Sequence, residues 1–293
     1  MKHAKKLNPL ETGMHVLFFL CGFVAVAFVL VITLYLIVSG LPAIREVGLV
    51  DFLFGTTWDS TNKTNPQYGI LPFILTSIYG TAGAILIGVP IGFMTAVFLA
   101  KVAPPKVASA IRPAVDLLAG IPSVVYGMVG MVILLPGIRE LFDLRAGDTL
   151  LAAIIVLAVM ILPSIISVSE TALRAVPREY EEASLALGAT EIETYFRVTA
   201  PAAKSGIAAA VVLGVGRAIG EAMAIMMVAG NAANMPSLFS SVKFLTTAVA
   251  SEMSYAPDGS LQKMALFSIG LVLFVFIMMI NIILNVVLKR EKE

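Results

Sequence analysis

Residues 150–169 read LLAAIIVLAVMILPSIISVS, a stretch of 20 residues without a single Asp, Glu, Lys or Arg. An α-helix needs roughly 20 apolar residues to cross the hydrocarbon core of a bilayer. A helix also satisfies its backbone hydrogen bonds internally, which lipid requires because it offers no partner for them. The stretch therefore predicts a membrane-spanning helix, and it sets the fold class of the chain.

Five more stretches have the same apolar character. Of the 293 residues, 59% are hydrophobic and 13% are charged, whereas a soluble domain has about 25% charged residues. We therefore expect an all-α integral membrane protein with six transmembrane helices, in which residues 16–293 form one transmembrane domain. The other five predicted spans are Val16–Val38, Leu71–Ala100, Pro113–Pro136, Gly206–Val228 and Met264–Leu288.

The distribution of Lys and Arg predicts the orientation of these spans. Loops rich in Lys and Arg stay in the cytoplasm. One set of helix ends and loops holds 13 basic residues and the opposite set holds 6, with Arg217 inside a span. We therefore place residues 1–15, the loop at 175–201 and both termini in the cytoplasm, and residues 40–70 in an external loop. The expected location is a membrane that borders the cytoplasm.

Composition also excludes several kinds of site. The net charge is +1, which gives no global field for binding nucleic acid. The chain has one cysteine, Cys21, and two histidines near its start, so no disulfide, no metal site and no Cys/His catalytic pair is expected.

The loop Ala175–Pro201, AVPREYEEASLALGATEIETYFRVTAP, is the most informative polar segment. Pro177 suits the first position of a helix that Gly188 can end. Thr190 and Glu193 have the spacing of a capping box for a second helix, which Pro201 is expected to stop. The pattern predicts two short helices that project from the membrane, either as a docking surface or as a simple solvated connection between two spans.

This loop resembles the cytoplasmic "EAA" loop of permeases in ATP-binding-cassette (ABC) importers. The resemblance implies that the loop is a coupling helix, which seats in a groove of a separate ATP-binding subunit. The chain has no Gly-x-x-x-x-Gly-Lys-[Ser/Thr] phosphate loop, so we expect no enzyme activity and no cofactor of its own, with ATP and magnesium bound by the partner ATPase. The matching residues are Glu182, Ala183, Ser184, Gly188 and Pro201.

Arg217 and Glu221 are the only charged residues deep in the fifth predicted span. On a continuous helix, two residues four apart share one face. A charge at the bilayer centre costs about 2.5–3.5 kcal/mol on insertion scales, so both side chains need partners or water. One interpretation is a self-neutralising structural pair. The functional one is that Arg217 lines a translocation path and binds an oxyanion, while Glu221 moderates its field.

The third predicted span contains helix-breaking residues. A proline and several glycines interrupt its helical pattern, and broken helices in membranes usually line a cavity or move. A kink without a functional role is the alternative. The residues that we predict to form a helix break at a pore are Gly120, Pro122, Ser123 and Gly127.

Three segments resemble the C-type permease subunit of the phosphate-specific transport system (PstC): LLAGIPSVVYG at 117–127, LGAT at 187–190 and LGVGRAIGEAMAIMMVAGN at 213–231. The resemblance implies a type I, MetI-like importer permease that carries inorganic phosphate. Its implied partners are a second permease subunit of PstA type, a homodimeric ATPase of PstB type, a periplasmic phosphate-binding protein of PstS type and membrane lipid.

Several alternatives stay open at this stage. The chain could be the A-type partner permease, or a sulfate or molybdate permease of the same class. Outside that class, it could be a secondary anion transporter or a phosphate-sensing membrane scaffold. Two acidic residues at helix ends, Asp116 and Glu170, could line the path or only cap helices.

Overall fold

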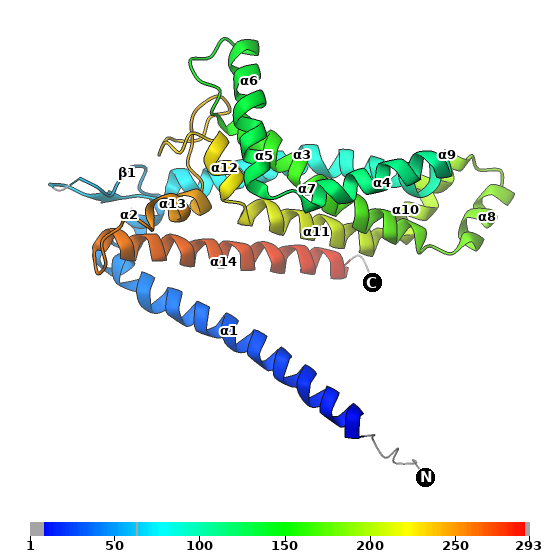
Figure 1. The fold of residues 1–293 in the computed structure, drawn as a ribbon, viewed down its shortest axis with the longest axis horizontal. Coiled ribbons are helices and arrows are strands. Elements are labelled where there is room, and N and C mark those ends of the chain that lie inside the picture. The colour runs from blue at the N-terminus through cyan, green and yellow to red at the C-terminus, as the bar shows by residue number, and fades with distance from the viewer. Residues whose placement is uncertain (1–8, 63, 291–293) are drawn as a thin grey trace.

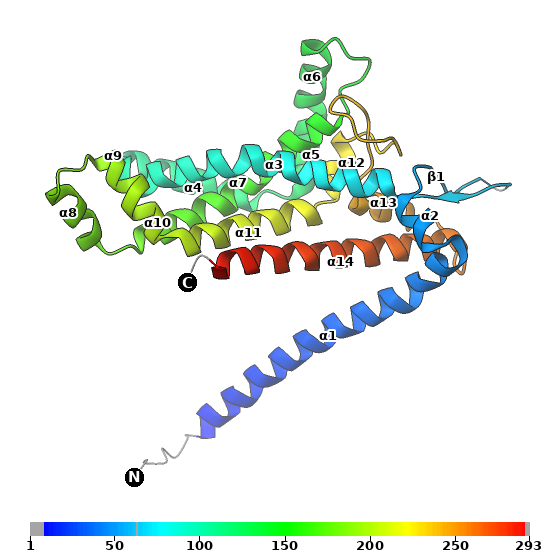
Figure 2. The same cartoon turned by 180° about the vertical axis from the view of Figure 1, so that it is seen from behind.

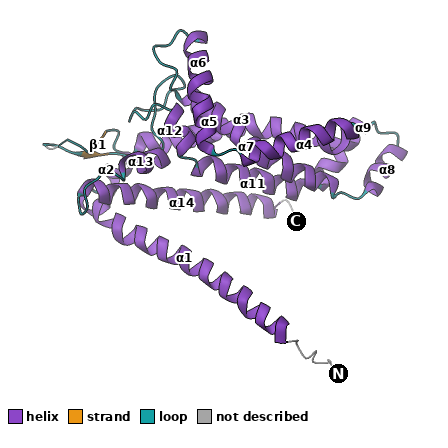
Figure 3. Cartoon of the chain, in the orientation of Figure 1, coloured by secondary structure: helices purple, strands orange, loops and turns teal. Residues whose placement is uncertain are grey.

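The structure is a computed structural model that describes residues 9–62 and 64–290. Helices form most of this part of the chain (Figure 3). The α-helices are α1 (Pro9–Val47), α2 (Leu49–Phe54), α3 (Leu71–Val97), α4 (Pro105–Gly120), α5 (Ser123–Val129), α6 (Leu135–Leu141), α7 (Leu150–Arg174), α8 (Arg178–Ala186), α9 (Glu191–Thr194), α10 (Ala200–Ala202), α11 (Lys204–Gly220), α12 (Met223–Val228), α13 (Leu245–Glu252) and α14 (Leu261–Arg290). Three π-helical turns are η1 (Phe98–Val102), η2 (Gly130–Leu134) and η3 (Tyr195–Thr199), and one antiparallel hairpin joins β1 (Trp58–Asp59) to β2 (Gln67–Tyr68).

The body of the molecule is a bundle in which α3, α4 and α11 pack on α7, and α14 runs alongside α11 (Figures 1 and 2). Of the spanning helices in the described residues, α7 is the most buried. Glycines let α3 approach it closely. A Cβ atom at Gly88 would lie 2.7 Å from Cδ1 of Ile161, and one at Gly92 would lie 2.8 Å from Cγ2 of Ile165. Small residues permit such close helix packing in lipid, so this contact fixes the core of the fold.

The number of spans agrees with the sequence prediction. Within residues 9–62 and 64–290, five helices are long and apolar enough to cross a membrane. The count rises to six if Glu191–Ala202 and Lys204–Gly220, which meet at 74°, are one broken span. The first predicted span, Val16–Val38, lies inside the longer helix α1, and the fourth continues beyond Ser169 to Arg174.

The predicted third span, Pro113–Pro136, is broken at Ile121 and Pro122, as its proline and glycines predicted. Helix α4 ends at Gly120, the backbone of Ile121 is extended (φ −69°, ψ 128°), and α5 begins at Ser123. The physical reason is Pro122, which has no N–H to continue the helix and disfavours a helical conformation in the residue before it. The apolar helix that qualifies as a span is Ser123–Leu141, and its last part, α6, turns away from the bundle (Figure 1).

The predicted fifth span, Gly206–Val228, is likewise two helices. Helix α11 ends at Gly220, and Glu221 has an extended backbone (φ −72°, ψ 130°) before α12 begins at Met223. Gly216 and Gly220 both fall in the last part of α11, and glycine is costly in a helix interior. This explains why the apolar run does not continue as one helix.

The two ends of the bundle differ. Helices α8 and α9 lie at one end, which we call the α8 end, and the hairpin lies at the other, the hairpin end (Figures 1 and 2). Helix α1 meets α14 near the hairpin end and diverges from it toward its own start. There, Oγ of Ser268 donates a hydrogen bond of 2.5 Å to the carbonyl oxygen of Gly40. The first turn of α1 and the last turn of α14 both lie toward the α8 end.

Within the predicted external loop at 40–70, the described residues 40–62 and 64–70 form a cap at the hairpin end. The buried indole of Trp58 donates hydrogen bonds of 3.1 and 3.2 Å to both carboxylate oxygens of Glu252. Lys243 pairs with the same carboxylate at 2.6 Å, and Ser60 donates to it at 3.2 Å. This network joins the hairpin to α13.

Candidate functional site

Two broken helices meet in the middle of the chain's fold. Helix α5, after the first break, packs on α12, after the second. Gly127 makes this contact possible, because a Cβ atom there would lie 2.7 Å from Sδ of Met227 and 3.0 Å from Cα of Ala224. The two breaks are therefore held close together by backbone contact rather than by long side chains.

Arg217 lies in the last turn of α11, just before the second break, and is half-buried. It makes no hydrogen bond or ion pair with any of the residues that the structure describes. Its charge lies within electrostatic reach of Tyr126 in α5. The neighbouring surface of α11 is open, because a Cβ atom at Gly216 or Gly220 would meet nothing within 4 Å. The guanidinium is thus available to a ligand.

Of the two interpretations of Arg217 and Glu221, the described residues do not contain the self-neutralising ion pair. Glu221 is the residue that ends α11, and its backbone is already extended. Its Oε1 accepts a hydrogen bond of 3.0 Å from the N–H of Ala224 in the first turn of α12, and its carbonyl oxygen accepts one of 2.7 Å from Thr246. A carboxylate in this position satisfies an orphan N–H at a helix start. Glu221 therefore holds the break in place.

Tyr126 was missed by reasoning from the sequence, although it lies in the segment 117–127. Its hydroxyl donates a hydrogen bond of 2.7 Å to the carbonyl oxygen of Leu118, which also accepts one of 3.3 Å from the N–H of Ile121 at the end of α4. Tyr126 thus ties α5 across the break to α4. The predicted pore residues Gly120, Pro122 and Ser123 all lie at this break, and their role in a path stays a prediction.

The arrangement has a clear chemical preference. A guanidinium is permanently charged, and it presents planar N–H donors that match the oxygens of an oxyanion. In low-dielectric surroundings its attraction for an anion is stronger than in water. Within the described residues, no group of three or more His, Cys, Asp or Glu side chains could hold a metal ion. The guanidinium of Arg217 has the chemistry to bind a small oxyanion.

The loop at the α8 end contains a second functional candidate. Of the residues predicted to contact an ATPase, Glu182, Ala183 and Gly188 are exposed. Gly188 has a φ of +86°, a conformation that favours glycine, and it ends α8. The hydroxyl groups of Ser184 and Thr194 are 2.9 Å apart and join α8 to α9.

Apolar side chains are also exposed on this loop. Leu187 is 90% exposed, and Tyr180 and Ile192 are exposed as well. Exposed apolar residues that gather outside a predicted span are typical of a contact with another protein. The loop thus has the apolar surface that a docking element needs.

Pro201 does not stop the second helix, contrary to the prediction. It lies in the first turn of α10, and the chain bends only after Ala202. In the turn η3 before it, the backbone hydrogen bonds shift to an i→i+5 pattern. The N–H of Ala200, for example, donates to the carbonyl oxygen of Tyr195. A proline, which has no N–H to donate, is accommodated next to this wider turn.

The loop is anchored by residues that the sequence did not single out. Nζ of Lys101 in η1 lies 2.5 Å from Oε1 of Glu181 in α8, and Thr199 donates a hydrogen bond of 3.1 Å to the same oxygen. The predicted Glu182 points to solvent, whereas its neighbour Glu181 makes the internal contact. A run of two glutamates gives no signal that distinguishes them.

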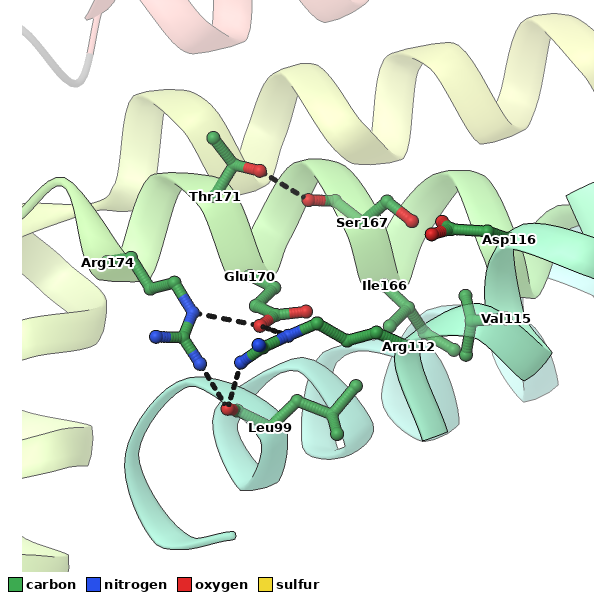
Figure 4. A pocket seen from close by; sticks show the side chains of 9 residues that line it. All are labelled: Leu99, Arg112, Val115, Asp116, Ile166, Ser167, Glu170, Thr171 and Arg174. Carbon is green, nitrogen blue, oxygen red and sulfur yellow. Dashed lines mark hydrogen bonds and ion pairs between the residues drawn. The ribbon is translucent and has the colours of Figure 1, made fainter. Parts of the chain in front are cut away.

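The two acidic residues left open by the sequence, Asp116 and Glu170, lie near each other at the α8 end (Figure 4). They line a pocket of about 360 Å³. Glu170 accepts hydrogen bonds from two arginines, Arg112 and Arg174, at 2.6 and 2.8 Å. Neither acidic residue forms an ion pair with Arg217.

The capping box of α9 gives a first testable prediction. Replacing Thr190 with alanine removes its hydrogen bond to the N–H of Glu193. We expect amide hydrogen exchange at residues 191–194 to rise by about fivefold, the usual effect of losing such a cap. Replacing exposed Ser109, which caps no helix start, is the control. Unchanged exchange would show that the cap does not hold α9.

The same cap predicts a pH dependence. Hydrogen bonds from the backbone and then the hydroxyl of Thr190 lower the pKa of Glu193. Because the folded-state pKa is lowered, the cap stabilises α9 fully above the unfolded-state pKa and loses its effect as the pH falls through the lowered value. Exchange at residues 191–194, corrected for its intrinsic pH dependence, should therefore rise on acidification in the parent protein and much less in Thr190→Ala.

Comparison with known proteins now adds to this geometry. Residues 88–292 match the family described as binding-protein-dependent transport system inner membrane component. The chain is 39% identical to the probable ABC transporter permease protein YqgH of Bacillus subtilis, covering 93% of this chain and 89% of that protein. It is 36% identical to the phosphate transport system permease protein PstC of Haemophilus influenzae, covering 94% and 91%.

Two solved structures have a similar fold. A bacterial alginate ABC transporter, in complex with a periplasmic protein bound to an alginate pentasaccharide, aligns with a TM-score of 0.66 at 15% identity and covers 96% of both chains. The MetNI methionine ABC transporter in an inward-facing conformation aligns with a TM-score of 0.60 at 20% identity and covers 76% of this chain and 95% of that one. At these identities the likeness concerns the fold.

Proposed function

Because the chain belongs to the family of binding-protein-dependent transport system inner membrane components, we propose that it is the C-type permease subunit of an ABC importer for inorganic phosphate. As a permease it is a transport component of the inner membrane and not an enzyme. The PstC relative, similar over nearly the whole chain, supports phosphate as the substrate. The observation that carries the proposal is the position of Arg217 beside two helix breaks. Its guanidinium forms no ion pair with any described residue.

Arg217 would act as a transient binding point for phosphate. A single guanidinium offers strong, directional hydrogen bonds to an anion, which lowers the cost of bringing the anion into an apolar passage. Glu221 lies four residues away in sequence and holds the break through Ala224. Its negative charge would limit how tightly the anion binds, so that phosphate is also released.

The partners follow from the type of importer. A binding protein of PstS type would deliver phosphate at the hairpin end, and a homodimeric ATPase of PstB type would dock on the exposed face of α8. In that arrangement both termini lie in the cytoplasm, which agrees with the placement of α1 and α14 relative to α8. A second permease of PstA type would complete the path, and the open face of α11 at Leu213, Gly216 and Gly220 supports its position.

Reconstitution tests this function. The chain is placed in vesicles with a PstA-type permease, a PstB-type ATPase and a PstS-type binding protein, and uptake of radiolabelled phosphate and sulfate is compared. We expect phosphate uptake that needs ATP and the binding protein and persists when a protonophore removes the proton gradient. Preference for sulfate would reassign the substrate. Uptake that is independent of ATP but lost with the proton gradient would refute the proposal that the chain belongs to an ATP-driven importer.

A further inference from the structure

We propose that Arg112 is a positioning residue for transport, which acts with Glu170 and Arg174 to transmit movement of α8 to the helix break in α4. The inference rests on the proposed function, because it concerns how movement driven by a partner ATPase reaches the path. It depends on side-chain contacts that join η1, at the end of α3, to α4, α7 and α8.

The first step is an unpaired carbonyl group at the end of α3. In an α-helix, the carbonyl oxygen of Leu99 would accept from the N–H of Ala103. In η1 that N–H instead donates to Phe98, at 2.7 Å. The next residue, Pro104, has no N–H. Leu99 is 1% exposed, so water cannot easily satisfy its carbonyl and the fold must supply another donor.

Two arginines supply that donor. Nη2 of Arg174 lies 2.6 Å from the carbonyl oxygen of Leu99, and Nη2 of Arg112 lies 3.3 Å from it. The Nε atoms of both residues donate to the same oxygen of Glu170 (Figure 4). Each guanidinium therefore bridges η1 and α7. Because Arg112 belongs to α4, the cluster connects η1, α4 and α7.

The cluster is sensitive to the loss of one member. The side chain of Glu170 is only 9% exposed, and without Arg112 it keeps Arg174 as its partner but loses its connection to α4. Lysine cannot replace Arg112, because an ammonium group is a compact point charge and cannot span both Leu99 and Glu170 as a planar fork does.

The next step links this cluster to α8. Lys101 lies in η1, two residues after Leu99, and its ion pair with Glu181 of α8 is largely buried, at 12% and 18% exposure. The hydroxyl of Tyr195 also donates to the carbonyl oxygen of Lys101, at 3.4 Å. Helix α7 ends at Arg174, four residues before α8 begins at Arg178. A displacement of α8 thus acts on both elements that Arg112 bridges.

The last step leads from Arg112 to the path. Helix α4 continues without interruption from Arg112 to Gly120, about 12 Å at 1.5 Å per residue. There it breaks, next to Tyr126, whose side chain is within reach of the charge of Arg217. Pro113 removes one backbone hydrogen bond at the start of this segment, but the helix continues to Gly120, so a shift at Arg112 is expected to change the geometry of the break.

The test compares uptake with ATP hydrolysis in the complete importer in vesicles. In Arg112→Gln, we expect the amount of phosphate taken up per ATP hydrolysed to fall at least about threefold, within the range of roughly 2-fold to 30-fold that mutations on a coupling connection produce. The hydrolysis rate in the presence of loaded binding protein should stay close to that of the parent. Lys106→Gln is the matched control, since Lys106 is exposed on the same helix and has no ion pair within the described residues.

A second measurement reports on the break itself. Cys21→Ser removes the single native cysteine, and Ser123→Cys places a thiol at the start of α5. ATP should change the labelling rate of this thiol in the parent but not in Arg112→Gln. If Arg112→Gln fails to assemble, Arg112→Lys carries the test, because it keeps the charge and loses the fork.

Two outcomes would overturn the inference. Uptake and hydrolysis that fall in the same proportion would show that the cluster only stabilises the fold, and an ATP-dependent labelling change that persists in the variants would show that α4 is driven by another route. A failure of the proposed function is distinguishable, because the parent importer would then lack ATP-dependent phosphate uptake. The labelling measurement needs only ATP and an assembled complex.

Discussion

Replacing Arg217 with alanine should abolish phosphate uptake while the importer still assembles. The guanidinium is half-buried beside two helix breaks and has no partner among the described residues, so its removal leaves no buried charge stranded. We expect uptake to fall by about 100-fold or more, the scale on which a charge-stabilising donor acts in a low-dielectric site. Uptake into vesicles at fixed protein content, with assembly checked by co-purification of the ATPase, measures the effect.

Two further variants sharpen this result. Arg217→Lys keeps the charge without the planar donors, and its uptake should lie between those of the parent and Arg217→Ala. Arg145→Ala removes an exposed arginine from the loop after α6 and should leave uptake unchanged. An assembled Arg217→Ala importer with the parent's uptake rate would remove Arg217 from the path.

Enlarging Gly127 should have the second largest effect. In Gly127→Val, the new side chain collides with Sδ of Met227 and the backbone of Ala224, so α5 must move away from α12. Overpacking of this kind costs about 1–3 kcal/mol. The shift also carries Tyr126 away from Leu118, which opens the first break. We expect a lower melting temperature in detergent together with loss of most of the uptake.

Gly137→Val provides the comparison for this change. It introduces the same side chain into the neighbouring helix α6, where a Cβ atom would meet nothing within 4 Å. Its melting temperature should therefore match that of the parent. If Gly127→Val were equally stable and fully active, the contact between α5 and α12 would not be needed to hold the breaks together.

The sequence was sufficient for the fold class because apolar length is a local property. The run at 150–169 needs no information from elsewhere in the chain to be identified as a spanning helix, and the same holds for α3 and α14. The end of α4 was also indicated locally, by Pro122. The local pattern did not predict that α5 and α6 turn away from the axis of the bundle (Figure 1).

The site was only partly predictable, because hydrogen-bond partners are set by tertiary packing. Arg217 stood out as a lone intramembrane cation, but its spacing from Glu221 suggested a continuous helix that the structure does not contain. The partner of Glu221 is the N–H of Ala224, which becomes available only once α12 starts as a separate helix. Glu170 is similar, since its two arginines lie 58 residues before it and 4 residues after it.

The network at the hairpin end has a consequence for how the protein is made. The indole of Trp58 finds its acceptor in Glu252, 194 residues later in the chain. During synthesis, this tryptophan therefore emerges long before its partner, and its hydrogen bonds form only after α3, α7 and α11 have been inserted. The cap is thus completed only once α13 has been made, so that a chain halted before α13 leaves the indole N–H of Trp58 without its protein acceptor, which distinguishes incomplete insertion chemically from the finished protein.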